Sequence, residues 1–245
     1  MNFFVVPAYN EEMNIGRLIK SLGDYHKKTG ENYRLIVVDD GSRDRTSEIV
    51  KEHSDRFPCA GIRYFPNQGV QDAFRRGFLR VLENAGPKDM IFTLEADGTA
   101  DLGLIPIFLE KIRKGADVVV ASYYAKGGSV EGTVWHRKIL SRLGNLFTRV
   151  FLPIPGIHTY SSFYRAYRPS ALRAVLDRYG DFYKETGFSC VVELLYRLYK
   201  MDFKLGEVPM VLQGSSRIGK SKMKVLQTIK GYLRIAARYA VKAPH

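Results

Sequence analysis

Met90-Ile91-Phe92-Thr93-Leu94-Glu95-Ala96-Asp97 is an apolar run that ends in two carboxylates, one residue apart. Residues i and i+2 of an extended strand point to the same side, so both carboxylates project from one strand end. Open α/β sheets bind ligands at that edge. Paired oxygen ligands suit Mg²⁺ or Mn²⁺. The triplet is equally compatible with an acidic turn that caps the following helix.

The residues around this segment alternate short apolar runs with helical patterns. The expected strands are 3–7, 33–39, 62–65, 90–95 and 117–122. The expected helices are 11–27, 44–53, 71–85 and 104–114. This βαβα order predicts an α/β fold with a mostly parallel sheet and helices on both faces.

The second half of the chain departs from this alternation. Its pattern predicts a glycine-rich loop at 126–132, a helix at 136–152, strands near 161–167 and 204–211, and a helix at 191–200. A loop at 214–222 precedes a final helix with one apolar stripe and a second face of basic residues. We therefore divide the chain into an α/β domain, 1–222, and a basic amphipathic helix, 223–245. That helix either packs on its own domain or lies on a membrane surface.

Composition restricts the class of protein. The chain has 245 residues with 45% apolar side chains, enough for a substantial core, and a net charge of +13 that favours polyanionic partners. Two cysteines without metal-ligand spacing fit a reducing, cytoplasmic compartment. The sequence shows no signal-peptide pattern and no apolar stretch of the length that spans a bilayer.

Three polar segments follow predicted strands, and strand ends of such a sheet share one edge. They are Val6-Pro7-Ala8-Tyr9-Asn10-Glu11-Glu12, Val37-Val38-Asp39-Asp40-Gly41-Ser42-Arg43-Asp44 and the opening triplet. Together they resemble the family-2 glycosyltransferases, which use nucleotide sugars and have the Rossmann-like GT-A fold. The resemblance covers nearly the whole chain.

Further motifs resemble the dolichyl- or polyprenyl-phosphate mannosyltransferases of that family. They are Val118-Val119-Val120-Ala121-Ser122, Gly127-Gly128-Ser129-Val130-Glu131-Gly132, Tyr164-Arg165-Ala166-Tyr167-Arg168 and Gly219-Lys220-Ser221-Lys222. The resemblance implies an inverting, metal-dependent transfer of a sugar of the mannose or glucose class. The donor would be GDP-mannose or a UDP-sugar, and the acceptor a polyprenyl phosphate at the cytoplasmic membrane face.

The resemblance also implies roles for matching residues. The nucleoside would be held by Pro7, Tyr9, Glu11 and Asp39, with Asp40 beside them. The Mg²⁺ or Mn²⁺ ion would be bound by Asp97, helped by Glu95 and Thr99. The acceptor phosphate would be received by Arg137, Ser141 and Arg217. Arg137 and Ser141 are an i, i+4 pair on one helix face, and a guanidinium suits a phosphate. Asp97, Arg137 and Arg217 are the residues expected to serve catalysis.

The chain departs from the family pattern at the metal motif and on the acceptor side. The usual Asp-Ala-Asp begins here with Glu95, and the usual Ser-Arg-Tyr is Ser122-Tyr123-Tyr124, without its arginine. An acceptor hydroxyl on a saccharide, protein or small metabolite therefore stays an alternative. It would require a general base, for which Glu185 and Glu193 are the candidates.

Two functions of other classes are alternatives to glycosyl transfer. The net charge alone allows a non-catalytic nucleic-acid-binding domain, but the sequence shows no recognition helix, RNA-binding aromatic motif or zinc module. No nucleic-acid partner is therefore expected. A nucleotidyltransferase on a related sheet is the other possibility.

Overall fold

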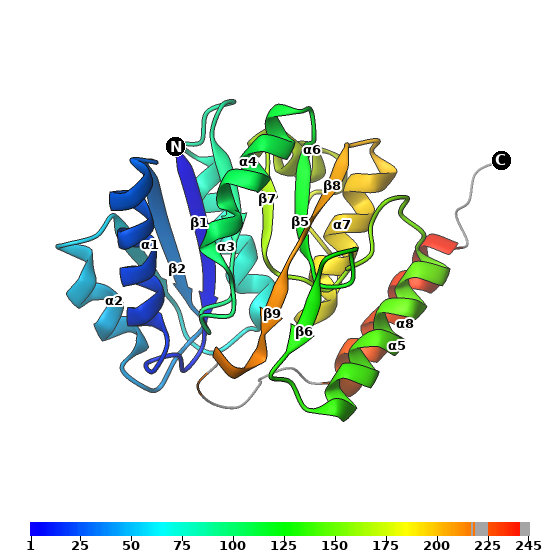
Figure 1. Ribbon diagram of the computed structural model, residues 1–245, viewed down its shortest axis with the longest axis horizontal. Helices are drawn as coiled ribbons and strands as arrows, with labels where there is room; N and C mark the ends of the chain where they lie inside the picture. The colour runs from blue at the N-terminus through cyan, green and yellow to red at the C-terminus, as the bar shows by residue number, and fades with distance from the viewer. Residues whose placement is uncertain (217, 219–224, 241–245) are drawn as a thin grey trace.

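A seven-stranded sheet forms the centre of the protein. The computed structural model describes residues 1–216, 218 and 225–240 (Figure 1). The strand order is β3-β2-β1-β4-β7-β5-β8, and β7 is antiparallel to both of its neighbours. The strands are β1 (Asn2–Ala8), β2 (Tyr33–Asp39), β3 (Cys59–Arg63), β4 (Met90–Thr93), β5 (Val118–Ser122), β7 (Arg165–Tyr167) and β8 (Leu205–Pro209). Strands β6 (Ser129–Glu131) and β9 (Val211–Gln213) form a separate parallel pair.

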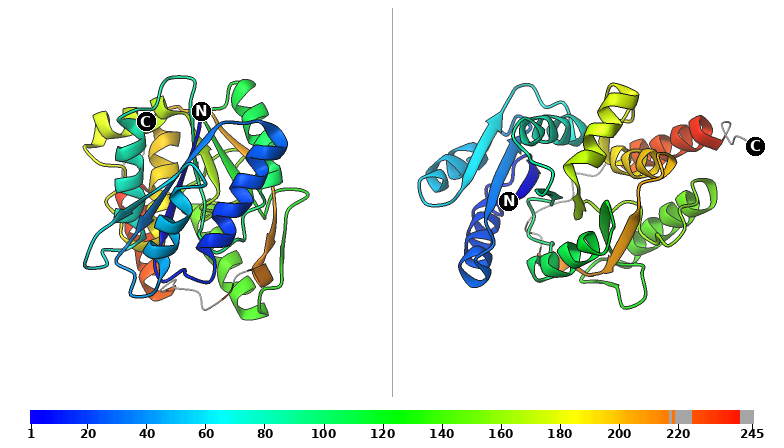
Figure 2. Two further views of the ribbon diagram at one scale, coloured as in Figure 1. Left: turned by 90° about the vertical axis from the view of Figure 1, so that its left-hand side faces the viewer. Right: turned by 90° about the horizontal axis from the view of Figure 1, so that it is seen from above.

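Helices cover both faces of the sheet (Figure 2). One face carries α1 (Ile15–Thr29), α2 (Thr46–Ser54) and α4 (Ile105–Arg113). The other carries α3 (Val70–Leu82), α6 (Pro169–Tyr179), α7 (Cys190–Lys200) and α8 (Val225–Ala240). Helix α5 (Trp135–Phe151) contacts α8 at one end of the molecule (Figure 1). The predicted fold class, a mostly parallel sheet between two helical layers, is confirmed.

The alternation of side chains along β1 explains the two layers. Phe3 and Val5 enter the core under α3, whereas Phe4 and Val6 enter the core under α1. Successive side chains of a strand point to opposite faces, so a strand buried on both sides has to be apolar at every position. The central strands are therefore continuous apolar runs.

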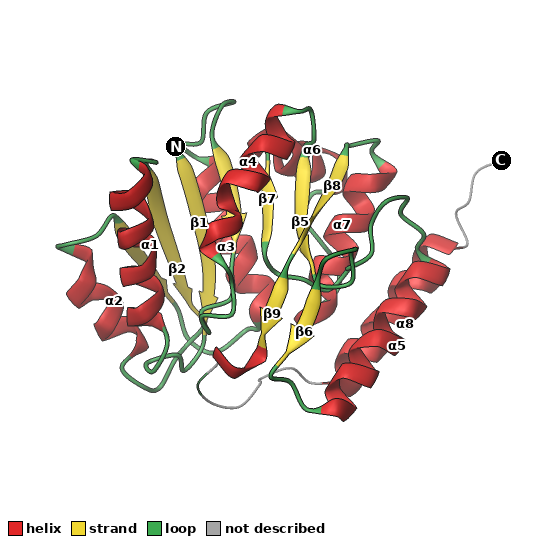
Figure 3. Cartoon of the chain, viewed as in Figure 1, coloured by secondary structure: helices red, strands yellow, loops and turns green. Residues whose placement is uncertain are grey.

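The topology places a switch point between β1 and β4. From β1 the chain builds outward through β2 and β3, and then returns to form β4 on the other side of β1. Both pairs that β1 makes are parallel, so β1, β2 and β4 end at one edge, which lies at the bottom of Figure 3. Ligands of such sheets bind where the order reverses.

Several expected elements are shifted or divided. Strand 62–65 lies earlier, at Cys59–Arg63. Of the strand expected at 161–167, only Arg165–Tyr167 has strand conformation, and the strand expected at 204–211 is broken at Met210 into β8 and β9. The loop expected at 126–132 contains β6, because Met210 accepts a hydrogen bond from Ser129 N and so brings β9 alongside. Helix α6 was not expected.

The final helix packs on the domain. Tyr232 and Ile235 of α8 are buried in the same core as α3 and α7. The expected boundary at 222 lies outside the described residues. Within the described part of the chain, no helix is both long and apolar enough to cross a membrane.

Candidate active site

A pocket of about 750 Å³ opens at the carboxyl edge of the sheet, at the switch point. Three groups of residues line it. The first group consists of residues 7–11 at the end of β1, Asp40 after β2, and residues 95–97 after β4. The turn into α3 adds 67–71. The third group consists of Phe163, 186–188, Ile218, Gln227 and Thr228. The three polar segments singled out in the sequence therefore meet in one cavity.

Asp97 is the more constrained of the two carboxylates after β4. It is buried, and its Oδ1 accepts hydrogen bonds from Thr99 N at 3.0 Å and from the Thr99 hydroxyl at 2.7 Å. Glu95 is half-buried, and both carboxylates line the pocket. Thr99, expected as a metal ligand, does not line the pocket and orients Asp97 instead.

The carboxylates fit a divalent ion that takes most of its ligands from elsewhere. Among the residues that the structure describes, no three His, Cys, Asp or Glu side chains are grouped to hold a metal. Mg²⁺ is commonly bound through one or two carboxylates plus water and substrate phosphates. Glu95 and Asp97 offer this hard oxygen donor set at the pocket wall.

The loops after β1 and β2 are joined by hydrogen bonds that fix the pocket floor. Asn10 N donates to Ser42 Oγ at 2.9 Å, and Glu11 N donates to Thr46 Oγ1 at 2.8 Å. Buried Asn14 then donates to Glu11 Oε2 at 2.7 Å and to Ile218 O at 3.0 Å. The first helix therefore starts after these contacts, at Ile15 rather than at the expected residue 11.

Asp39 and Asp40 are adjacent but have different surroundings. Asp39 lies off the pocket wall, where its Oδ1 accepts from Ser42 N at 2.8 Å and its Oδ2 from Ser47 Oγ. Asp40 lines the pocket and accepts hydrogen bonds from Gln68 N at 2.7 Å and Gly69 N at 2.8 Å. Burial raises the pKa of Asp40 above its ordinary value. Asp39 thus shapes the turn, whereas Asp40 faces the ligand space.

Two of the residues expected to bind the acceptor phosphate, Arg137 and Ser141, are not among the described residues that line this cavity. Arg137 is exposed on α5, and Ser141, one turn later, accepts a hydrogen bond from the Tyr124 hydroxyl at 2.8 Å. Arg217 lies outside the described residues. Tyr123 stands where the family has arginine; it is hydrogen-bonded to Ser161 at 2.9 Å, and burial raises its pKa to about 12. Tyr123 is therefore a neutral hydroxyl near pH 7.

The two candidate general bases are both engaged by arginines. Glu193 is fully buried and pairs with Arg197 and Arg238, each at 2.8 Å. Glu185 is buried and pairs with Arg234 at 2.6 Å and with Arg238 at 2.8 Å. Neither carboxylate lines the pocket.

Sequence reasoning missed one wall of the pocket. The residues not anticipated are Asn67, Gln68, Gly69, Gln71, Phe163, Thr186, Gly187, Phe188, Gln227 and Thr228. The turn before α3 carried a usable signal, since Asn-Gln-Gly before an amphipathic run is typical of a turn into a helix. The contribution of α8 had no local signal, because it depends on packing between distant segments.

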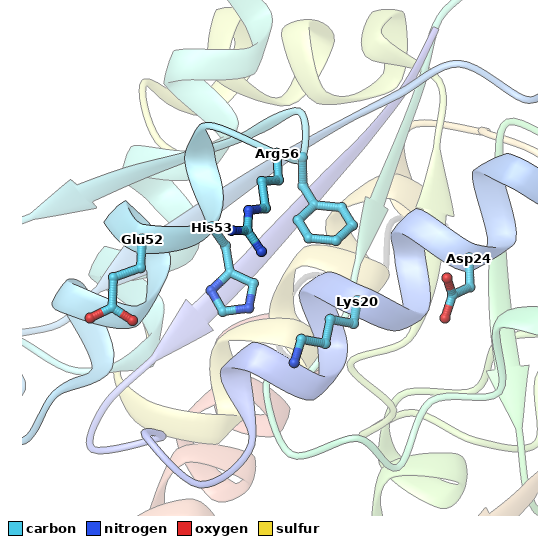
Figure 4. A pocket seen from close by; sticks show the side chains of 6 residues that line it. Lys20, Asp24, Glu52, His53 and Arg56 are labelled. Carbon is cyan, nitrogen blue, oxygen red and sulfur yellow. The ribbon is translucent and has the colours of Figure 1, made fainter.

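A second hollow, of about 470 Å³, lies between α1 and α2 (Figure 4). Its charged lining residues are Lys20, Asp24, Glu52, His53 and Arg56. They come from α1, α2 and the turn after α2 rather than from the carboxyl ends of strands, and they mix both signs of charge. The hollow lacks the paired carboxylates of the larger pocket.

Residues 3–176 match the family model described as glycosyl transferase family 2. The dolichol-phosphate mannosyltransferase of Pyrococcus furiosus is 33% identical over 232 residues, which cover 94% of this chain and 61% of that protein. The chain thus spans less than two thirds of that relative. The polyprenol monophosphomannose synthase of Mycolicibacterium smegmatis is 28% identical over 229 residues, which cover 89% of this chain and 79% of that protein.

A solved structure has the same fold at low sequence identity. It is glucosyl-3-phosphoglycerate synthase from Mycobacterium tuberculosis, in complex with Mn²⁺, UDP-glucose and phosphoglyceric acid. It superposes with a TM-score of 0.66 at 17% identity, over 97% of this chain and 80% of that one. The mixed sheet described above therefore occurs in an enzyme that binds a nucleotide sugar.

Proposed function

Because the chain belongs to glycosyl transferase family 2, we propose that it transfers a sugar of the mannose or glucose class from a nucleotide-diphosphate sugar to a polyprenyl phosphate. The observation that carries this proposal is the meeting of three loops in one pocket: 7–11, Asp40 and 95–97 all line it. The relatives named as dolichol-phosphate and polyprenol-phosphate mannosyl enzymes support the acceptor class.

The nucleoside of GDP-mannose or a UDP-sugar would lie against the ends of β1 and β2. Pro7, Tyr9 and Glu11 would contact it. Asp40 would replace Asp39 as the aspartate that faces it, because only Asp40 lines the pocket. The backbone amides of Gln68 and Gly69 donate to Asp40, which holds the turn before α3 beside the proposed nucleoside site.

Glu95 and Asp97 would hold Mg²⁺ or Mn²⁺ beside the donor diphosphate. Such an ion supplies positive charge that stabilises the leaving diphosphate. The Thr99 hydroxyl and amide fix the orientation of Asp97, as outer hydrogen bonds commonly do for carboxylate ligands. The structural neighbour in complex with Mn²⁺ and UDP-glucose supports a divalent ion beside a nucleotide sugar in this fold.

The acceptor phosphate is anionic at neutral pH and needs no general base. The protein has to bring it to the anomeric carbon and shield like charges. Direct displacement by the phosphate oxygen would invert the anomeric centre. Arg137 and Ser141 on α5 are the proposed contacts of the phosphate within the described chain, and Arg217 is the third. The engagement of Glu185 and Glu193 by arginines supports a base-free transfer.

We place the enzyme on an anionic membrane surface at its α5–α8 end. Apolar side chains stand exposed on both helices: Ile139, Leu143, Leu146 and Val150 of α5, and Leu226, Ile229 and Leu233 of α8. Basic residues accompany them, among them Arg142, Arg149 and Lys230. Exposed apolar side chains with basic neighbours are the pattern of helices that lie in a lipid interface. The two buried, unpaired cysteines agree with the reducing cytoplasmic side.

Transfer can be assayed with GDP-mannose and UDP-glucose as separate donors, Mn²⁺, and a short polyprenyl phosphate in detergent. A lipid-phosphate sugar with inverted anomeric configuration is the expected product. Tight nucleotide binding without transfer from any common donor would refute the lipid-phosphate acceptor. A matched reaction with the corresponding polyprenol, which lacks the phosphate, should give no product.

A hydroxyl acceptor is the second candidate, favoured by one observation. Tyr123 replaces the family arginine with a neutral hydroxyl that bonds to Ser161. This lowers the positive charge on the acceptor side. If a hydroxyl is the acceptor, Arg137→Gln should leave activity close to that of the wild type. If a phosphate is the acceptor, the same substitution should raise the KM for the acceptor.

A further inference from the structure

Helix α8 carries part of the pocket wall, although it comes last in the sequence. Gln227 and Thr228, in its first turn, line the same pocket as the proposed donor loops. Gln227 Nε2 donates to the Thr186 hydroxyl at 3.4 Å, and Thr186 belongs to the same wall. The geometry of this wall therefore depends on how α8 is seated.

Two arginines of α8 form ion pairs with two buried carboxylates and so hold the helix against the domain. Arg234 donates from both Nε and Nη2 to Glu185 Oε2, at 2.9 and 2.6 Å. Arg238 bridges the pair, with Nη2 to Glu185 Oε1 and Nη1 to Glu193 Oε1, each at 2.8 Å. A guanidinium fork can hold two carboxylates at once, which a lysine ammonium does less well.

The same carboxylates hold the backbone that leads into the pocket wall. Glu193 Oε2 accepts hydrogen bonds from Lys184 N at 2.8 Å and Glu185 N at 2.7 Å. Two residues later, Gly187 N donates to Gln71 Oε1 at 2.7 Å, which ties the segment to α3. Segment 184–187 thus lies between the arginines of α8 and the pocket.

A close backbone approach is the second, independent feature of this seat. A Cβ on Gly231 would lie 2.2 Å from Ser189 Oγ and 2.5 Å from Ser189 Cβ. Only glycine lets α8 come this near to the 3₁₀ turn η2 (Gly187–Ser189), which lines the pocket through Gly187 and Phe188. Charge and shape therefore fix the same contact.

We infer that Arg234 and Arg238 are positioning residues for the sugar-transfer site: with Gly231 they set the distance between α8 and segment 184–189, and so the part of the pocket wall that these two segments form. The inference rests on the proposed function for its kinetic consequence. The exposed face of α8 belongs to the proposed membrane surface. The packing of α8 on segment 184–189 therefore connects that surface to the pocket.

Four variants separate positioning from plain stability. Arg238→Gln breaks the bridge, Arg238→Lys keeps the charge but loses the fork, and Gly231→Ala separates the surfaces while leaving every charge in place. Arg173→Gln is the matched control: Arg173 of α6 donates to Leu82 O and Ala85 O, at 2.7 and 2.8 Å, away from the pocket. Each variant is measured for thermal midpoint, donor KM, kcat and amide hydrogen exchange.

Arg238→Gln and Gly231→Ala should each raise the donor KM about tenfold with a smaller effect on kcat. Both should speed amide exchange at Lys184, Glu185 and Gly187, with Arg238→Lys between them and the wild type. Arg173→Gln should lower the thermal midpoint only. The inference would be overturned if both test variants kept the wild-type donor KM and exchange rates while their thermal midpoints fell by as much as that of the control.

The proposed function can fail separately. If the wild type transfers no sugar, the exchange rates and the affinity for GDP or UDP still decide the inference. Faster exchange together with weaker nucleotide binding in Arg238→Gln and Gly231→Ala supports positioning. Wild-type values for both quantities contradict it.

Discussion

Asp97 shows how one residue is prepared for its proposed role by its nearest neighbours. It is buried, follows a strand at the switch point, and is oriented by two hydrogen bonds from Thr99. Orienting a carboxylate by outer hydrogen bonds removes rotamer freedom that binding would otherwise have to remove. Glu95 has the longer, more flexible side chain and is half-buried. The two carboxylates should therefore differ in their response to substitution.

Asp97→Ala should reduce metal-dependent transfer by about 10³-fold, since the charge beside the leaving diphosphate is lost. The measurement is kcat/KM over a Mn²⁺ titration. Asp101→Ala is the control, because Asp101 is an exposed carboxylate that caps the turn at Gly103 N. Equal losses in both variants would contradict a special role for Asp97.

Glu95→Asp restores the carboxylate that the family motif usually has at this position. Activity equal to or above that of the wild type would show that the ion accepts the shorter side chain. We expect retained activity with an altered preference between Mg²⁺ and Mn²⁺, since ligand reach affects the two ions differently. Loss of activity as large as that in Glu95→Gln would mean that the extra methylene is required here.

At this scale, the sequence predicts which segments meet but not which side chain faces the ligand. Asp39 and Asp40 are neighbours, and the alternation along a strand sends them in different directions. Which of the two lines the pocket depends on the turn that Ser42 and Ser47 stabilise. A resemblance to a family motif does not resolve that choice.

At the scale of elements, the prediction succeeded where hydrophobic runs were long and buried on both sides. Strands β1, β2, β4 and β5 were placed within a few residues, since continuous apolar runs specify them. The short elements were misplaced. Met210 divides one apolar run between two sheets through its hydrogen bonds with Ser129 N and Ser122 O, a long-range contact that local pattern does not encode.

Helix α3 and strand β1 provide a test of packing behind the site. A Cβ on Gly77 would lie 2.3 Å from Val5 Cγ1 and 3.2 Å from Val38 Cγ2. Gly77→Ala should therefore lower the free energy of unfolding by about 1–3 kcal/mol, as overpacking of a core does. Chemical denaturation measures it.

Gly206→Ala is the control for that change. Its nearest atoms to a new Cβ are all at 3.8 Å, an ordinary contact. The free energy of unfolding should stay within about 0.5 kcal/mol of the wild type. If Gly77→Ala is equally neutral, α3 and β1 can separate more easily than their packing indicates.

At the scale of the whole molecule, the pocket and the proposed membrane surface belong to one fold built around the central sheet. The donor loops lie at the carboxyl edge, and the α5–α8 surface lies at one end of the molecule (Figure 1). Helix α8 belongs to both, through Gln227 at the pocket and Leu233 on the exposed face.

The amphipathic pattern of this helix could be predicted from sequence. Its share in the pocket could not, because that depends on ion pairs with residues some 50 positions earlier, at Glu185.

Vesicle binding tests the surface formed by α5 and α8. The wild type should sediment with vesicles that contain anionic lipid, less with neutral vesicles, and less at high salt. Leu143→Glu and Leu233→Glu should each weaken binding about tenfold or more, since burying one leucine in the interface contributes about 1.5–3 kcal/mol.

Ile107→Glu on α4 is the matched control, because Ile107 is also exposed but lies outside this surface. Equal binding by all three variants would assign membrane contact to another part of the protein. Loss of binding only in Leu143→Glu and Leu233→Glu, with transfer to a short acceptor in detergent retained, would separate membrane contact from chemistry.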